Sequence, residues 1–386
     1  MLRLTRLTLT EFRNYPALTW RPGARLSVVT GPNGSGKTNL LEAISLLVPG
    51  RGLRNARIGE FGRNGAAWGV VGWLERDGMT SEVATGTPPD GPLDRRVFRL
   101  DGAAVRSQAD IAGAAASVWL TPQMDRLFSE AASGRRRFLD RLVWALEPGH
   151  AREVAAYETA MASRSRLLAA GGADPAWLAG LEDSMARHAI AVAAARTGLV
   201  ARLNATMAAD ATVRFPPALV GLEDPIADRL AAEPALAVED WLRGALAGSR
   251  GADTGGSARF GAHRADMTLM DRESGLAAGL ASTGQQKALL IGVLLGHAAL
   301  IAGARGAAPL LLLDEPAVHL DFERRAALWE ALAAGPSQAV LTGTDDGAFA
   351  GLEGRAEFLL TGGGTLQVNR AYAAPSPVFQ GPPGLY

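Results

Sequence analysis

Hydrophobic residues near the N-terminus follow two different periods. In residues 2–9 leucines alternate with polar residues, which predicts a half-buried strand. Residues 26–30, Leu-Ser-Val-Val-Thr, predict a buried strand that runs into a glycine-rich turn. A helix is expected next, over about 37–48, and it should end before Pro49. One face of this helix carries Leu40, Leu41, Ile44 and Leu47.

The middle of the chain, from about residue 125 to 247, is rich in alanine and has a helical pattern. Asp174 and Pro175 form an N-cap and first-turn pair for a long helix. Apolar positions in this helix then recur at a spacing of three and four residues. A stretch rich in glycine and serine at 248–257 predicts a linker. We therefore expect a helical arm inserted between two halves of another domain.

Strands and helices alternate in the rest of the chain. Strand-like patterns at 267–271, 310–313 and 338–342 are separated by helical patterns at 284–303 and 322–334. This alternation is typical of a mostly parallel sheet with helices on its faces. Short strand-like runs split by turn signals, earlier in the chain, predict additional antiparallel strands. The expected fold class is α/β: a head with a mostly parallel sheet and antiparallel N-terminal strands, carrying an inserted helical arm.

These patterns divide the chain into four expected ranges. Residues 1–125 form the first part of the head, 126–249 form the helical arm, and 250–372 form the second part of the head. The last range, 373–386, is rich in proline and glycine, and we expect it to be disordered.

Composition excludes several classes of function. The chain has no cysteine, which excludes disulfides, thiolate metal sites and cysteine nucleophiles. It shows no signal-peptide pattern and no uncharged apolar run long enough to span a membrane, so we expect a cytoplasmic protein without a membrane partner. The 39 Lys+Arg balance the 39 Asp+Glu, so any contact with nucleic acid must be a local patch. Residues 1–63 hold ten basic residues against three acidic ones, which fits either such a patch or attraction to another part of the fold.

A phosphate-binding motif follows the buried strand at 26–30. It consists of Gly31, Pro32, Asn33, Gly34, Ser35, Gly36, Lys37 and Thr38, and it matches G-x-x-x-x-G-K-[ST] in full. The glycines let backbone N–H groups converge on phosphate oxygens. Lys37 is expected to reach the β- and γ-phosphates, and Thr38 to offer its hydroxyl to Mg²⁺. ATP and Mg²⁺ are therefore the expected ligands.

Two carboxylates follow the apolar strand at 310–313. Open α/β sheets bind ligands at the carboxyl ends of their strands. We expect Asp314 to hold Mg²⁺ and Glu315 to orient the attacking water, so that Lys37, Asp314 and Glu315 are the predicted catalytic residues. Only two of the 39 basic residues are lysines, Lys37 and Lys287, and both fall inside motifs.

A third motif resembles the signature of ABC ATPases and consists of Ser282, Thr283, Gly284, Gln285, Gln286 and Lys287. It is also a capping box that opens a helix. The resemblance implies that this helix N-terminus contacts the γ-phosphate held by an opposite subunit, and that a D-loop ending at Asp321 lines the seam. Thr283 stands where a glycine is usual and Thr344 where a switch histidine is usual. The missing histidine predicts slow hydrolysis and a switch-like use of ATP.

The chain resembles the RecF family of bacterial recombination mediators, within the ABC/SMC-like ATPases, over almost its entire length. Lys37 and Gly284 are 247 residues apart, which is too far for a typical transporter ATPase and too close for an SMC coiled coil. The stretches that carry the resemblance are 9–15, 135–140, 261–266 and 282–287.

The resemblance implies an ATP-dependent homodimer that binds DNA at junctions of single- and double-stranded DNA. It also implies that the protein works with RecO and RecR, and indirectly with RecA, in repair, replication restart and the SOS response. Two other classes remain as alternatives. One is a transporter-type ATPase subunit, which the motif spacing disfavours, and the other is a nucleotide-gated scaffold that does not hydrolyse ATP.

Several arginines are candidates for phosphate or DNA contacts. Arg135, Arg136 and Arg137 are expected at a helix N-terminus, where positive charge opposes the helix dipole. The alternatives are a contact with DNA or nucleotide and a face that is solvated or paired within the chain. Arg54, which follows the helix of the phosphate-binding motif, is a candidate for sensing nucleotide or DNA.

Overall fold

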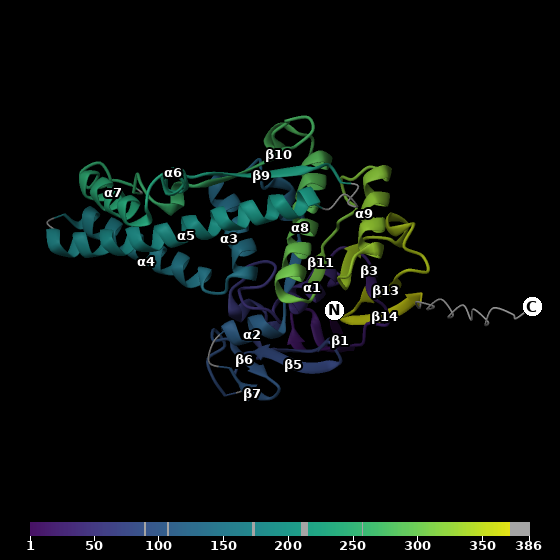
Figure 1. Cartoon of the computed structure of the whole chain (residues 1–386). Helices are drawn as coiled ribbons and strands as arrows, with labels where there is room; N and C mark the ends of the chain where they lie inside the picture. Colours follow the sequence, from purple (N-terminus) through teal and green to yellow (C-terminus); the bar gives the residue numbers. More distant parts are fainter. Residues whose placement is uncertain (89, 106–107, 172–173, 210–214, 257, 371–386) are drawn as a thin grey trace, which may run out of the picture.

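The computed structural model describes residues 1–370, except for residues 89, 106–107, 172–173, 210–214 and 257. The expected disordered range 373–386 lies outside these residues. Figure 1 shows a head formed by both ends of the chain and a helical arm that projects from one side of it.

One sheet of the head is antiparallel and has the strand order β2-β1-β4-β5-β6-β7. In β1 the pairing with β4 shifts between Leu4 and Arg6, which keeps Leu4 and Leu7 on the same buried face although three positions separate them. The strands of this sheet are β1 (Leu2–Phe12), β2 (Tyr15–Trp20), β4 (Gly69–Arg76), β5 (Met79–Gly86), β6 (Val97–Leu100) and β7 (Ala103–Ala104).

The second sheet has the order β14-β13-β3-β12-β11-β8, and all neighbours pair in parallel except β13 and β14. All four residues of β11 are buried, because Leu310 and Leu312 face one core and Leu311 and Leu313 the other. The strands are β3 (Leu26–Thr30), β8 (Ser117–Leu120), β11 (Leu310–Leu313), β12 (Ala339–Gly343), β13 (Glu357–Gly362) and β14 (Thr365–Arg370).

Helix α1 (Lys37–Ser45) lies in the core between the two sheets. Its apolar side chains Leu40 and Ile44 are fully buried in a cluster that contains Leu9 of β1 and Leu312 of β11. The opposite face of the parallel sheet is covered by α3 (Ala132–Leu146), α8 (Thr283–Arg305) and α9 (Phe322–Ala334). The short helix α2 (Gln108–Ala114) precedes β8.

The arm has its own apolar core, built from α4 (His150–Ala170), α5 (Pro175–Ala209), α6 (Pro225–Leu230) and α7 (Ala235–Gly248). The middle of α5 contributes Met185 and Val192 to this core, whereas Leu199 and Leu203 pack in the core of the head. A two-stranded antiparallel ribbon, β9 (Ala218–Glu223) and β10 (Asp266–Asp271), runs beside the junction.

Packing places the ends of the arm differently from the ranges expected from sequence. Phe138 and Leu142 of α3 belong to the core of the head, while Ala258 and Ala262 belong to the core of the arm. Asp253, inside the expected linker, is buried. We therefore propose that the arm extends from about α4 to residue 262 instead of from 126 to 249.

Helix α8 is the one described helix that is long and apolar enough to cross a membrane by length and composition. However, 61% of its apolar window is buried inside the protein. It therefore has the burial of a core helix, between the parallel sheet and α5.

A buried ionic network ties the end of the arm together. Arg164 of α4, which is 1% exposed, donates to Oε1 of Glu182 at 3.0 Å and to Oδ2 of Asp253 at 2.9 Å. It also donates to the carbonyl of Leu246 at 2.7 Å, and Arg250 supplies a second cation to Glu182. Two cations and two carboxylates thus balance, with Arg164 and both carboxylates buried and Arg250 27% exposed at the edge.

We expect Arg164→Ala to lower the free energy of unfolding of the arm by about 3 kcal/mol, because it leaves buried carboxylates short of a partner. Urea denaturation followed by far-ultraviolet circular dichroism measures this effect. Arg166→Ala is the matched control on the same helix, and its exposed side chain should contribute less than about 0.5 kcal/mol. Equal losses in the two variants would contradict the assignment.

Candidate nucleotide-binding site

The loop between β3 and α1 has the conformation that its glycines permit. Gly31, Gly34 and Gly36 have φ angles of 146°, 80° and 110°, in a region that other residues rarely adopt. A Cβ atom at Gly36 would also collide with the side chain of Asn14. The eight predicted residues therefore form one continuous turn from the end of the strand into the helix.

Lys37 closes this loop from inside. Its side chain is buried, and Nζ donates to the carbonyls of Gly31 at 2.7 Å and Pro32 at 3.0 Å. The hydroxyl Oγ of Ser35 is buried and has no hydrogen-bond partner among the described residues. A buried hydroxyl and an ammonium group within one glycine-rich turn fit the oxygens of a phosphate group.

The segment before β2 supports the loop, which reasoning from the motif alone missed. Asn14 donates to the carbonyl of Ser35 at 3.0 Å, and the hydroxyl of Tyr15 donates to that of Gly36 at 3.1 Å. Burial raises the pKa of Tyr15, so this hydroxyl keeps its proton. The available signal was the stretch 9–15, which carries part of the resemblance to the family.

Asp314 connects the loop helix to two strands of the parallel sheet. The carboxylate is 3% exposed, and its Oδ1 accepts from Thr38 at 3.1 Å and from Thr342 at 2.6 Å. Thr38 and Asp314, which are 276 positions apart, are thus brought together. Thr342 at the end of β12 was not predicted, although a polar residue ending a neighbouring parallel strand is the available signal.

The oxygen atoms of Thr38 and Asp314 are the hard ligands that Mg²⁺ prefers. No group of three or more His, Asp or Glu side chains that could hold a metal occurs among the described residues. A metal ion here would therefore take its remaining ligands from nucleotide phosphates and water, as is usual for Mg²⁺ at such sites.

Glu315 follows Asp314 in a strained backbone conformation. Its φ angle is 49°, and the next residue is Pro316. The backbone N–H donates to Oγ1 of Thr342 at 3.1 Å, and the carbonyl accepts from Nζ of Lys287 at 2.9 Å. The backbone N–H and the backbone carbonyl of Glu315 are therefore both hydrogen-bonded to side chains.

The predicted signature opens α8 with a complete capping box. Oγ of Ser282 accepts from the backbone of Gln285 at 3.3 Å, and the side chain of Gln285 accepts from the backbone of Ser282 at 2.9 Å. Ser282 and Thr283 are exposed, as a contact with another molecule requires. Gly284 lies against the D-loop, because a Cβ atom there would be 2.5 Å from the carbonyl of His319.

Lys287 does not lie at this exposed surface, which corrects its assignment to the contact with an opposite subunit. Its side chain is 1% exposed and turns into its own chain, where Nζ is 3.3 Å from Oδ2 of Asp125. The reason is its place in the second turn of α8, on the face packed against the head. Asp321 is the N-cap of α9, where it accepts from the backbone of Arg324 at 2.8 Å.

The structure separates the candidate arginines. Arg135 makes two hydrogen bonds of 2.7 Å to Asp266, and Arg136 donates to the carbonyl of Ala265 at 2.8 Å. Compensation within the chain therefore applies to these two, while Arg137 is exposed. Arg54 is partly exposed and donates to Oδ1 of Asn39, a residue of α1, at 2.8 Å.

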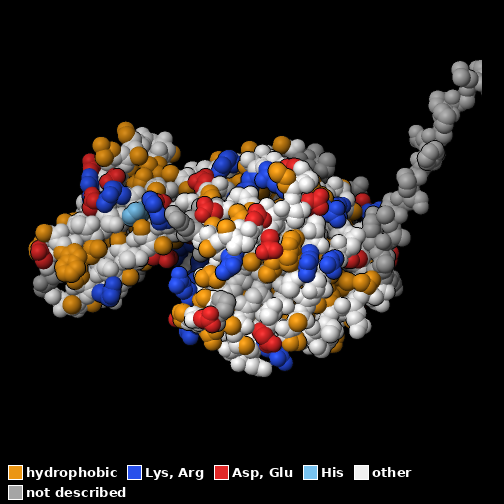
Figure 2. All heavy atoms as spheres, turned by 90° about the horizontal axis from the view of Figure 1, so that it is seen from below, with side chains coloured by type: hydrophobic (Ala, Val, Ile, Leu, Met, Phe, Trp, Pro, Cys, Tyr) orange, Lys and Arg blue, Asp and Glu red, His pale blue; other side chains and the backbone are white. Residues whose placement is uncertain are grey.

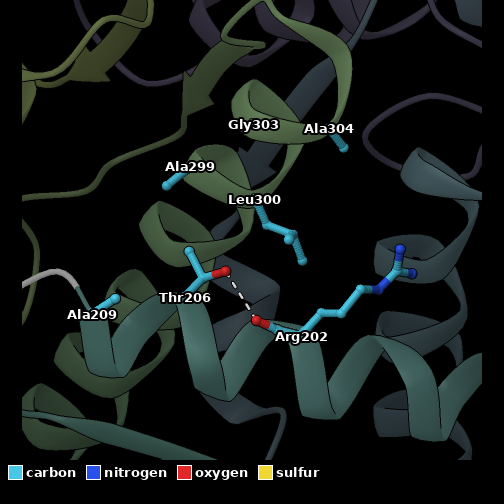
Figure 3. Close-up of a pocket in the computed structure, with 7 residues that line it drawn as sticks. All are labelled: Arg202, Thr206, Ala209, Ala299, Leu300, Gly303 and Ala304. Atoms are coloured by element: carbon cyan, nitrogen blue, oxygen red, sulfur yellow. Dashed lines mark hydrogen bonds between the residues drawn. The ribbon is translucent and has the colours of Figure 1, made fainter.

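Two clefts among the described residues lie away from this loop. Figure 3 shows a cleft of about 580 Å³ between α5 and α8, lined by small and apolar residues together with Arg202 and Thr206. A second cleft of about 700 Å³ lies between α5 and the start of α4, beside His150. Neither is lined by a predicted site residue, so the candidate site is defined by converging polar groups at the edge of the sheet.

Several known proteins resemble this chain in sequence or in fold. Residues 26–75 match the family described as "AAA domain, putative AbiEii toxin, Type IV TA system". The DNA replication and repair protein RecF of Mesorhizobium japonicum is 46% identical over 371 residues, which cover 94% of this chain and 97% of that protein. The RecF protein of Allorhizobium ampelinum is 44% identical over 369 residues, or 95% and 98% of the two chains.

The chain belongs to the RecF family. The identity to these DNA replication and repair proteins over nearly the whole chain confirms the resemblance seen in the sequence. A solved structure of the recombination mediator protein RecF-ATPrS in the RecFOR pathway has a TM-score of 0.82 and 20% identity, covering 96% of this chain and 98% of that one. An Smc head domain from Pyrococcus furiosus gives a TM-score of 0.51 at 14% identity, with 95% and 96% coverage. The predicted fold, an ABC-type ATPase head, is confirmed for this RecF-family chain.

We expect Asn14→Ala to weaken ATP binding by about tenfold, equal to about 1.4 kcal/mol, because the loop carbonyl of Ser35 loses the shorter of its two side-chain hydrogen bonds and keeps only that from Thr361. Titration calorimetry on the purified protein measures the dissociation constant. Thr10→Ala, which changes an exposed side chain of β1, is the control and should leave the dissociation constant unchanged. An unaltered affinity in Asn14→Ala would show that this segment does not support the loop.

Proposed function

We propose that this chain is an ATP-dependent DNA-binding protein of recombinational repair and replication restart. ATP brings two copies together at junctions of single- and double-stranded DNA, where the dimer works with RecO and RecR to help load RecA. The protein thereby supports the SOS response, and it acts in the cytoplasm. Family membership supports this proposal, since the relatives are DNA replication and repair proteins over nearly the whole chain.

The observation that carries the nucleotide part is the meeting of Thr38 with Asp314 beside the buried Ser35 hydroxyl. The structural neighbours also include one described as RecF-ATP in the RecFOR pathway. In the proposed mechanism Lys37 and the loop N–H groups bind the phosphates, while Thr38 and Asp314 hold Mg²⁺. The bound ion would supply positive charge that neutralises the phosphate oxygens.

Hydrolysis is assigned to Glu315, whose carboxylate follows the metal-binding aspartate at the edge of the sheet. Glu315 would orient the attacking water and accept its proton. Thr344, at the position of the usual switch histidine, donates to its neighbour Asp345 at 3.1 Å. A threonine hydroxyl is a weaker proton acceptor than imidazole, so we propose slow turnover and the use of ATP as a dimerisation switch.

Exposed apolar side chains beside the signature support a dimer. Leu280 is 80% exposed just before the capping box, and Phe322 is 75% exposed just after the D-loop. Val318, within the D-loop, is 43% exposed. Apolar groups beside exposed polar ones are typical of a protein interface, and a second copy with its nucleotide is the occupant we propose.

DNA binding is assigned to local arginines because the net charge is zero. Arg51, Arg54 and Arg57 are exposed after the loop helix, and Arg137 is exposed on α3. Basic and acidic side chains are interspersed on the face of the molecule seen in Figure 2. A transporter-type role is not favoured, because the full-length relatives are DNA replication and repair proteins.

The wild type should form dimers on gapped DNA with ATP and stay monomeric without it. Light scattering coupled to size exclusion measures the mass, and electrophoretic retention measures the DNA complex. Lys37→Met should weaken ATP binding about 100-fold, equal to about 2.7 kcal/mol, and remain a folded monomer. A dimer that forms equally in Lys37→Met, or wild-type monomers that ignore DNA, would refute the proposal.

Glu315→Gln should bind ATP and dimerise but release phosphate about 100- to 1,000-fold more slowly, because the amide cannot accept a proton from water. Single-turnover phosphate release measures the rate. If the wild type releases no phosphate while still dimerising, the nucleotide-gated scaffold is the correct class instead.

A further inference from the structure

We propose that Lys287 is a positioning residue for hydrolysis: its ammonium group fixes the backbone of Glu315 and so links the signature helix of a chain to the water-orienting carboxylate of the same chain. This role rests on the proposed ATPase function. It differs from the role expected for a signature lysine, which was contact with the nucleotide of an opposite subunit.

The contacts of Lys287 join three elements of the head. Nζ donates to the carbonyl of Glu315 at 2.9 Å, directly after β11, and pairs with Asp125 at 3.3 Å, in the 3-10 turn Pro122–Arg126 that follows β8. The lysine side chain is 1% exposed and that of Asp125 is 8% exposed. A buried ammonium group is costly unless it is paired and hydrogen-bonded, so Lys287 is held in the orientation that keeps these two contacts.

The backbone of Glu315, to which Lys287 donates, has a strained conformation. A non-glycine residue at a φ of 49° costs on the order of 1–3 kcal/mol and persists only where its surroundings impose it. The following Pro316 restricts Glu315 further. Two side chains impose the conformation: Thr342 accepts from the N–H, and Lys287 donates to the carbonyl. Without the lysine, the carbonyl keeps only the longer hydrogen bond from the backbone N–H of Val318, at 3.3 Å, and the side-chain anchor on that side is lost.

The choice of lysine also follows from this geometry. Of 39 basic residues, Lys287 is one of two that are not arginine. Arginine presents a planar fork, whereas the compact ammonium group can point at one carbonyl and one carboxylate in a narrow space. Both side chains are shielded from solvent, and this burial lowers the pKa of Lys287 and raises that of Asp125. One oxygen of Asp125, Oδ1, is buried without a hydrogen-bond partner among the described residues.

The same helix contacts both ends of the D-loop segment. Lys287 holds Glu315 at its start, and Gly284 lies against the carbonyl of His319 near its end. His319 is the second non-glycine residue of this segment with a left-handed φ, at 67°. Ser282 and Lys287 lie at the N-cap and in the second turn of one helix. A displacement of the exposed capping box would therefore move Lys287 and, through its hydrogen bond, the backbone of Glu315. Binding of a second copy at the signature would thus act on hydrolysis through Lys287.

The test separates positioning from folding. Lys287→Met keeps the length of the side chain but leaves Asp125 buried without its cation, so it is paired with the neutral double variant Lys287→Met, Asp125→Asn. We expect kcat of ATP hydrolysis to fall at least tenfold in both, with the dissociation constant for ATP within about threefold of wild type. ATP-dependent dimerisation should persist in the double variant. Arg355→Met, which removes an exposed cation of the head, is the control and should keep the wild-type kcat.

Each outcome decides the matter. An unchanged kcat in the double variant would overturn the role of Lys287, as would a fall in kcat accompanied by an equal fall in ATP affinity, since that result indicates a purely structural role. If Lys287→Met does not fold, the double variant alone decides. A wild type that binds ATP without hydrolysing it would overturn the proposed ATPase function itself. An active wild type together with equally active variants would instead overturn only the role of Lys287.

Discussion

The candidate site depends on one buried carboxylate. Asp314 accepts hydrogen bonds from Thr38 and Thr342, and so connects the end of β11 to the phosphate-binding helix and to β12. A buried carboxylate is costly unless it is fully hydrogen-bonded, so these hydroxyls and the carboxylate require one another. Parallel strands provide the frame, because their carboxyl ends meet at a single edge. The polar groups that converge there arise from segments far apart in the chain.

Layering explains why this edge is rigid. Helix α1 is packed between the antiparallel and the parallel sheet, and α8 covers the other face. The phosphate-binding loop is therefore supported from behind by α1 and from the side by Asn14 and Tyr15. In contrast, the capping box at Ser282 is exposed. The head thus combines a well-supported glycine-rich loop with an exposed helix N-terminus.

Local sequence patterns predicted the elements well, and the pairings between distant segments poorly. The strand 310–313 and the helix 322–334 were predicted at their observed ends, because apolar runs and caps are local properties. The direction of Lys287 could not be predicted, since it depends on Asp125, 162 positions away. The pairing of Arg135 with Asp266 depends in the same way on a strand 131 positions away. The exception is the pair Thr38 and Asp314, 276 positions apart, which were expected to lie together because both were assigned to the same metal ion.

One helix serves two cores. The 35 residues of α5 form about 52 Å of unbroken backbone hydrogen bonding, of which one part packs in the arm and the other beside α8. Bending α5 at the junction between arm and head would break helical hydrogen bonds. Moving the whole helix would pull Leu199 and Leu203 out of the core of the head. A movement of the far end of the arm would therefore be transmitted along α5 to α8, against which its other end packs.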